Sequence, residues 1–240
     1  MKRILLTTAS LCVLGLVSPA LAADLPIYGK APVVATAAYD WSGFYIGVFG
    51  GGGYGNHNLN NATGPAGLAN FTANYSSQGG LGGGEIGYNW QSGNIVVGVE
   101  ATAFGADIKG GDSFALGWDD ATKLSWGGTL RARGGIAVDR LLLFFTGGWG
   151  YGSLTHTDTN PGVGVDTFKT TRSGLAAGGG IAYAITENLI GKFEYTYLDL
   201  GTFRRDAPTN GVLAYNVANT YSIVTFGLDY KFGGPVVAKY

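Results

Sequence analysis

The stretch LSWGGTLRARGGIAVDRLLLFFTGGWGYG, Leu124–Gly152, decides the fold because it reads as two long β-strands joined by a tight turn. In its first half, residues alternate between an apolar or small set and a polar, charged or small set, which is the period of a β-strand. The turn falls at Val138–Arg140, and a strand of similar length returns. The apolar set consists of Leu124, Trp126, Gly128, Leu130, Ala132, Gly134 and Ile136.

This hairpin alone fits two classes of fold. In a soluble β-sandwich the apolar set would face a protein core, and Arg131 and Arg133 would face water. In a transmembrane β-barrel the apolar set would face lipid, and the two arginines would face the lumen. The remainder of the chain has to distinguish these classes.

The composition indicates one all-β domain that does not bind nucleic acid. The 240 residues include 43 glycines, with 13% charged and 13% aromatic residues, and aromatic and aliphatic residues recur in strand-sized blocks. The formal net charge is −1, and there is no basic stripe of the kind that contacts nucleic acid.

The first 22 residues read as a secretory signal peptide. Lys2 and Arg3 precede an apolar core, and Ala20–Ala22 is a small-residue cleavage motif. Residues 23–40 are expected to form a periplasmic N-terminal linker. The only cysteine, Cys12, lies within the signal peptide, so the mature chain is expected to lack disulfides and cysteine-based metal sites.

Eight strands are expected after the linker. Connections between them alternate between long polar segments and short turns, as in transmembrane barrels with long external loops and short periplasmic turns. A Greek-key sandwich gives no reason for this alternation. The sequence therefore predicts an eight-stranded antiparallel up-and-down transmembrane β-barrel over residues 41–232, with a C-terminal tail at 233–240. The expected strands cover about 41–54, 78–90, 95–107, both halves of 123–152, 169–185, 189–201 and 219–232.

The alternation also assigns side chains to the two faces of the barrel. An eight-stranded barrel is filled by side chains, and charges of opposite sign can pair there. Glu100 and Arg131 are the expected neighbouring pair. The predicted lumen charge network is Glu85, Glu100, Arg131, Arg133, Lys192 and Glu194. The predicted lipid-facing and girdle residues are Trp41, Tyr88, Trp90, Trp126, Trp149, Phe193, Tyr195, Tyr197, Phe226, Tyr230 and Phe232.

Six segments carry a further signal: Trp41–Gly47, Gly83–Trp90, Gly98–Glu100, Leu130–Gly135, Gly191–Tyr195 and Phe226–Phe232. Together they resemble the small outer-membrane β-barrels of alphaproteobacteria, the outer-membrane immunogenic protein or porin-like surface antigen family. The resemblance implies a surface-exposed barrel without catalytic activity. Its implied partners are outer-membrane lipid and lipopolysaccharide, the barrel-assembly machinery that reads a terminal aromatic residue, and an unknown loop ligand.

Three other functions stay open from the sequence. The first is a narrow small-solute or ion channel, and the second is a soluble carbohydrate-binding sandwich. The third is an envelope enzyme, but His57 and His156 both fall in predicted external loops without an obvious nucleophile–base pair. No catalytic, cofactor-binding or metal residue is assigned.

A weak divalent-cation site is the remaining possibility for the second predicted external loop. Its four aspartates are expected to be solvated, or to hold a cation that bridges to lipopolysaccharide. They are Asp107, Asp112, Asp119 and Asp120.

Overall fold

The computed structural model describes residues 39–63, 72–114, 118–160, 164–205 and 214–233. The predicted signal peptide, nearly all of the predicted linker and the tail after Gly233 lie outside these ranges. Across the described ranges, no helix is long and apolar enough to cross a membrane.

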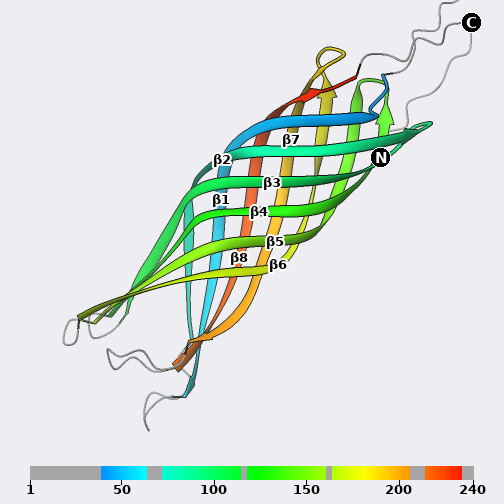
Figure 1. Ribbon diagram of the computed structural model, residues 1–240. Coiled ribbons are helices and arrows are strands. Elements are labelled where there is room, and N and C mark those ends of the chain that lie inside the picture. The colour runs from blue at the N-terminus through cyan, green and yellow to red at the C-terminus, as the bar shows by residue number, and fades with distance from the viewer. Residues whose placement is uncertain (1–38, 64–71, 115–117, 161–163, 206–213, 234–240) are drawn as a thin grey trace, which may run out of the picture. The chain divides into compact units, whose positions relative to one another are not determined.

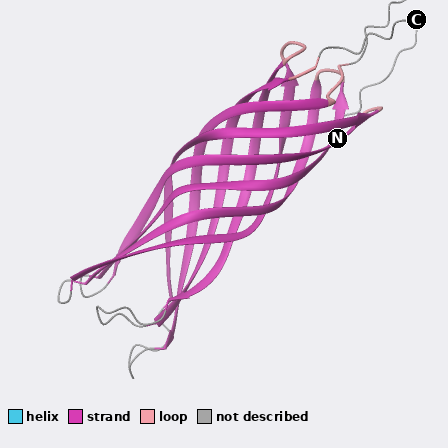
Figure 2. Ribbon diagram, in the orientation of Figure 1, coloured by secondary structure: helices cyan, strands magenta, loops and turns pink. Residues whose placement is uncertain are grey.

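Eight antiparallel strands form one closed barrel, and no other type of element occurs in the described residues (Figures 1 and 2). Each strand pairs with its neighbours in sequence, and β1 also pairs with β8, which gives an up-and-down barrel. The predicted fold is therefore confirmed. The strands are β1 (Gly43–Thr63), β2 (Thr72–Ser92), β3 (Ile95–Phe114), β4 (Trp118–Val138), β5 (Leu141–Asn160), β6 (Gly164–Ala184), β7 (Leu189–Arg205) and β8 (Ala214–Lys231).

All eight strands extend further than predicted toward the same end of the barrel. Short turns join β2 to β3, β4 to β5 and β6 to β7 at one end, which we call the turn end; the opposite end is the loop end. The predicted connections at the loop end are mostly strand, so their assignment as loops was wrong. Segments rich in Asn, Gly, Thr and Asp read as loops in the sequence, but cross-strand backbone hydrogen bonds can hold such residues in a sheet. Only 64–71, 115–117, 161–163 and 206–213 separate the strands there.

The wall divides into two sheets near the loop end (Figure 1). Among the described residues, pairing of β2 with β3 stops at Gln78 and Lys109, and pairing of β6 with β7 stops at Leu175 and Asp199. Beyond these points one sheet consists of β7, β8, β1 and β2, and the other of β3, β4, β5 and β6.

A β-bulge in β4 changes which face its side chains occupy. The register of β4 with β5 shifts between Leu124 and Trp126, so Ser125 is the extra residue. A bulge breaks the two-residue alternation by one position. Leu124 is consequently buried in the interior while Trp126 is exposed on the outside. The prediction that Leu124 belongs to the lipid face was wrong for this reason.

Two apolar clusters fill the interior, one on each side of a charged layer. The cluster toward the loop end comprises Leu81, Phe104, Ile108, Leu124, Leu154, Ala176, Leu198, Leu200, Tyr221 and Ile223. The cluster at the turn end comprises Tyr39, Trp41, Val96, Ala137, Leu142, Phe144, Ala182, Ala184 and Ile190. The charged layer between them is thus enclosed by apolar side chains.

Candidate functional site

A compact layer of charged side chains crosses the barrel between the two apolar clusters. All six residues predicted for the lumen network are buried there, on strands β2, β3, β4 and β7. Charged groups withdrawn from water in this way are stable only when they are paired and hydrogen-bonded.

Arg131 links two of the carboxylates. Its Nη2 lies 2.6 Å from Oε1 of Glu100, and its Nη1 lies 2.6 Å from Oε1 of Glu194. Nη1 also donates to the hydroxyls of Thr146 and Thr196, both at 3.0 Å. One guanidinium therefore connects β3, β4, β5 and β7 across the lumen. The Glu100–Arg131 pair expected from the sequence is present, and these residues are direct cross-strand partners.

Glu100 is the centre of the layer. Besides Arg131, it forms ion pairs with Arg133 and, at 3.2 Å, with Lys192, and the Tyr45 hydroxyl donates to its Oε2 at 2.9 Å. The Arg133 guanidinium carbon lies 4.4 Å from the centroid of the Phe144 ring. Cation–π contact of this kind is favourable away from water. Arg133 thus couples the charged layer to the apolar cluster at the turn end.

Lys192 completes the network from β7. Its ammonium group forms an ion pair with Glu85 and lies 3.5 Å from Oε2 of Glu194. Asp229 and Tyr45 were not among the predicted members of the network, but both are buried in it. Asp229 interacts electrostatically with Glu85, and Tyr45 interacts with Arg133 and Glu100. The two-residue alternation of β8 places Asp229 on the inward face, so the sequence pattern could have identified it as a member of the network.

The carboxylates and the cations of the layer nearly balance in charge. This balance distinguishes a metal site from a plug, that is, a set of salt bridges that fills the lumen. Oxygen atoms of Glu85, Glu100 and Glu194 lie within 4.8 Å of one another, close enough to share an ion. Each of these carboxylates is already paired with a buried Arg or Lys. A metal ion would have to displace these cations, so the arrangement is that of a plug.

A small cavity of about 30 Å³ borders the charged layer on its loop-end side. Arg131, Glu194 and the hydroxyl groups of Thr102, Thr129 and Thr196 line it, together with apolar residues of the loop-end cluster. Such a volume holds about one water molecule. This cavity by itself is too small to be part of a wide aqueous path.

Trp41 closes the turn end of the barrel from the inside. It is 1% exposed, and its indole Nε1 donates to the carbonyl oxygen of Asp139 at 3.2 Å. Tyr39 packs edge-on against it and donates its hydroxyl to the carbonyl of Glu187 at 3.1 Å. Burial raises the pKa of Tyr39 to about 12, which keeps this phenol neutral.

The prediction that Trp41 faces lipid was therefore wrong. An aromatic residue just before a first strand reads as part of an interfacial girdle. Here the chain folds into the barrel mouth before β1 begins at Gly43, and the backbone N–H of Trp41 donates to the side chain of Gln91 at 2.6 Å. The sequence contains no periodic signal for this packing, because Trp41 precedes the strand.

His57 and His156 occupy the interior near the loop end. Both are 1% exposed and lie on β1 and β5, so the expectation that they fall in external loops was wrong. His57 is hydrogen-bonded through Nδ1 to Asn219 at 2.7 Å and through Nε2 to Ser77 at 2.9 Å. It also stacks on Tyr75, with ring centroids 4.8 Å apart.

The Ser77–His57–Asn219 array has the order of groups found in nucleophile–base–orienter triads. Its three side chains are no more than 1% exposed. A methyl group at Gly55 would overlap the Ser77 hydroxyl, which shows how tightly this region is packed. The two hydrogen bonds hold the histidine ring in place between β2 and β8.

A chain of hydrogen bonds joins the two sheets of the loop end. The Tyr75 hydroxyl on β2 is 2.5 Å from the Thr122 hydroxyl on β4, and that hydroxyl is 2.7 Å from Nδ1 of His156 on β5. These contacts hold the sheets together beyond the point where β2 and β3 stop pairing.

The four predicted loop aspartates do not converge on a cation site. They all lie on strands: Asp107 is on the outer face with Lys109 and Lys123, whereas Asp120 is buried inside. Asp112 and Asp119 are exposed near the ends of β3 and β4. The expectation of a single acidic loop was wrong, because all four residues lie on strands: Asp112 and Asp120 are direct cross-strand partners, whereas Asp107 lies on the outer face with two lysines.

The outside of the barrel carries an apolar band at the turn-end half. Every predicted lipid-facing residue other than Trp41 is at least 37% exposed. Aromatic side chains lie at both edges of the band, as in transmembrane barrels. Trp90, Tyr230 and Phe232 lie toward the turn end, while Trp126 and Trp149 lie toward the loop end.

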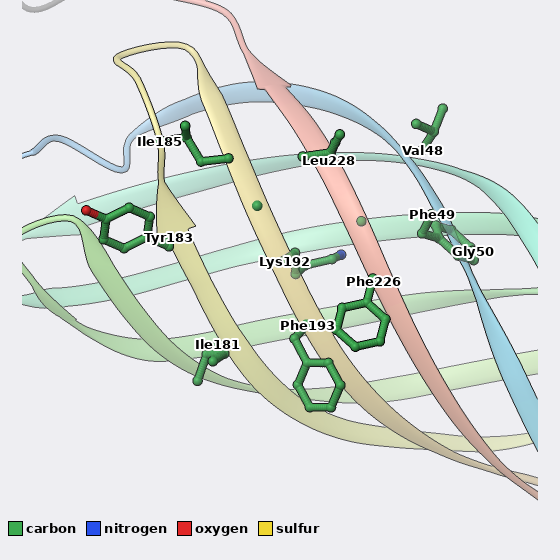
Figure 3. Close-up of a pocket in the computed structure, with 12 residues that line it drawn as sticks. Val48, Phe49, Gly50, Ile181, Tyr183, Ile185, Lys192, Phe193, Phe226 and Leu228 are labelled. Atoms are coloured by element: carbon green, nitrogen blue, oxygen red, sulfur yellow. The ribbon is translucent and has the colours of Figure 1, made fainter.

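An apolar hollow of about 620 Å³ lies within this band (Figure 3). It forms over β7 and β8, where Gly191 and Gly227 provide no side chain, and Ile181, Phe193 and Phe226 are among the residues around it. Its apolar lining makes it part of the surface that contacts acyl chains.

A closed antiparallel barrel with an apolar outer band, two aromatic borders and a polar, filled interior defines the class of eight-stranded outer-membrane barrels. The sequence matches the family model described as the outer membrane protein beta-barrel domain over residues 9–232. The chain belongs to this family and is an integral protein of the bacterial outer membrane.

Relatives named as outer-membrane proteins resemble most of the chain. A 31 kDa outer-membrane immunogenic protein of Brucella melitensis is 34% identical over 233 residues, covering 89% of this chain and 93% of the relative. A 22 kDa outer membrane protein of Rhizobium leguminosarum is 31% identical over 194 residues, covering 76% and 79%. The crystal structure of the outer membrane protein OprG from Pseudomonas aeruginosa matches with a TM-score of 0.48 and 16% identity, covering 80% and 97%.

Proposed function

We propose that this protein is a structural and surface-interaction barrel of the outer membrane, without catalytic activity, which presents its loop end to the exterior. The observation that carries the proposal is the filled interior: a salt-bridge layer lies between two apolar clusters. A barrel filled in this way has its exposed residues at the loop end and on the outer wall. The printed name of the Brucella relative, an immunogenic protein, fits exposure at the cell surface.

The orientation follows the rule that outer-membrane barrels have short turns in the periplasm and longer connections outside. Protease treatment of intact cells tests it. A cleavage site inserted in 206–213 should be cut in intact cells, and a site inserted at Gly93 should be cut only after the outer membrane is permeabilised. The reverse pattern would overturn the orientation and with it the surface role.

A narrow channel is the second candidate, because charged residues line the middle of the lumen. For conduction, ions would have to pass Trp41 at the turn end and the Leu124–Leu154 region toward the loop end, and both are buried in apolar clusters. Single-channel recording separates the two candidates. A flat baseline supports the structural role, whereas discrete openings abolished by the charge-altering variant Glu100→Gln would support the channel.

Catalysis by the Ser77–His57–Asn219 array is tested with a fluorophosphonate probe on the folded protein. We expect no labelling, because Ser77 is enclosed. Labelling that disappears in Ser77→Ala would contradict the absence of catalysis.

A further inference from the structure

Asp229 on β8 and Glu85 on β2 approach each other across a glycine. Both are in register with Gly47 on the intervening strand β1, from opposite sides. A Cβ at Gly47 would overlap Oδ1 of Asp229, so the aspartate side chain lies over this glycine. The carboxyl groups of Asp229 and Glu85 are hydrogen-bonded to each other. The space left by Gly47 therefore brings together two acidic groups from strands that are not neighbours in the wall.

A hydrogen bond between two carboxyl groups requires a proton. An ionised carboxylate can only accept hydrogen bonds, so one member of such a pair has to be protonated in order to donate. Burial strengthens this requirement, because Glu85 is 4% and Asp229 is 2% exposed. Two ionised carboxylates that share a site away from water repel each other, and one bound proton removes the repulsion.

No ion pair of Asp229 occurs among the described residues, and no described donor is hydrogen-bonded to its Oδ1. Its cross-strand partner on β7 is Ile190, a member of the turn-end apolar cluster. Asp229 is also absent from the lining of the small cavity that can hold a water molecule. Lys192 acts on Asp229 electrostatically, but its ammonium lies within ion-pairing distance of three other carboxylates, those of Glu85, Glu100 and Glu194.

The groups that surround the pair leave one negative charge uncompensated. Four buried carboxylates and three buried cations face one another in the layer, together with one tyrosine hydroxyl that donates to Glu100. One bound proton makes the layer neutral. By strand, these groups are Tyr45 on β1, Glu85 on β2, Glu100 on β3, Arg131 and Arg133 on β4, Lys192 and Glu194 on β7, and Asp229 on β8.

Lys231, the next inward-facing residue of β8, does not supply the missing charge. Its ammonium donates to the carbonyl oxygen of Asp40 and lies 4.4 Å from the centroid of the Tyr39 ring. It interacts electrostatically with Asp40 and Glu187, and Glu187 is also paired with Arg140. Two cations and two carboxylates therefore balance each other in this group at the turn end, separately from the charged layer.

We propose that Glu85 and Asp229 form a proton-binding site, which holds one proton at neutral pH and makes the salt-bridge layer neutral. The proton is taken up from water when the barrel closes, because the two carboxyl groups are solvated and ionised in the unfolded chain. The plug is consequently most stable in acid, and it loosens when the pair ionises in alkaline solution. This inference rests on the interior of the barrel and not on what the loop end binds.

Infrared spectroscopy of the full mature protein in phosphatidylcholine vesicles tests whether the proton is present. A neutral carboxylic acid has a carbonyl-stretch band separate from the bands of an ionised carboxylate, and the wild type should show this band at neutral pH. Asp229→Asn and Glu85→Gln should each lose it, because the remaining carboxylate then accepts a hydrogen bond from an amide. Glu187→Gln alters an exposed carboxylate at the turn end and is the matched control, which should keep the band.

The pH dependence of unfolding is the second measurement. The folded state holds a proton that the unfolded chain releases above a pH of about 4, so the folding equilibrium constant falls as the pH rises, by up to about tenfold per pH unit. The fall ends where the pair ionises in the folded state. Asp229→Asn removes the site and should lack this component of the pH dependence, whereas Glu187→Gln should retain it.

A monovalent metal ion is the competing occupant of the site. Replacing sodium with choline at constant ionic strength should leave the stability unchanged; sodium-dependent stability without the acid band would overturn the proposal. So would a wild-type spectrum without the band, a band that persists in both variants, or equal pH dependence in the wild type and Asp229→Asn. Heat-dependent gel migration checks that the variants are folded, and if one fails, the wild-type spectrum and the other variant decide the question.

Discussion

Glu100 on β3 and Arg131 on β4 are direct cross-strand partners, and their Oε1 and Nη2 atoms lie 2.6 Å apart with both side chains almost excluded from solvent. Through its other nitrogen, Arg131 reaches Glu194 on β7. This relationship ties together strands that are not neighbours in the wall, so the interior stabilises the closed barrel as well as filling it.

Replacing Arg131 with alanine should destabilise the barrel by about 3–5 kcal/mol, because two buried carboxylates would lose a cation. Urea unfolding in lipid vesicles measures this. Arg140→Ala is the control: its ion pair with Glu187 at the turn end is exposed, and such pairs contribute at most about 1 kcal/mol. Equal effects of the two variants would mean that the interior network does not hold the strands together.

Introducing arginine at Leu130 should impair insertion into the membrane. Leu130 is 58% exposed within the apolar band, and an arginine there costs about 2–4 kcal/mol near the bilayer midplane. Folding into vesicles of defined lipid is the measurement. The control Thr155→Arg should fold normally, because Thr155 lies on the outer face of β5 above the band, directly between Lys123 and Lys169. Normal insertion of Leu130→Arg would show that the assigned faces are reversed.

Trp41 should be shielded from lipid, unlike Trp90, Trp126 and Trp149. Single-tryptophan variants in vesicles of brominated lipid distinguish the two environments by fluorescence quenching. Strong quenching is expected for the three exposed tryptophans and little for Trp41, because its ring is enclosed by the turn-end cluster. Strong quenching of Trp41 would place it in an interfacial girdle instead.

Adjacent glycines in β2 should respond differently to alanine. A Cβ at Gly83 would overlap the backbone carbonyl oxygen of Ala103, whereas a Cβ at Gly84 would lie 3.4 Å from the carbonyl oxygen of Gly47. We expect Gly83→Ala to destabilise by about 1–3 kcal/mol through overpacking. Gly84→Ala should be close to neutral or slightly stabilising, because it restricts the unfolded chain. Comparison of their urea midpoints decides this, and similar midpoints would argue against close packing at Gly83.

The sequence by itself determined the number of strands, their antiparallel order and the faces of most side chains. Period-two alternation is a local property, so it assigned Glu85, Lys192 and Glu194 to the interior and Trp90 and Phe226 to the outside before any long-range contact was known.

Only the tertiary structure decided the features that depend on contacts between distant segments. The bulge at Ser125 reverses the alternation and turns Leu124 inward, and Trp41 packs into the barrel mouth from outside any strand. His57 and His156 are interior because cross-strand hydrogen bonds extend the sheet through polar segments that read locally as loops. Strand ends, bulges and plugs are set by pairing across the barrel, and a local pattern contains no information about that pairing.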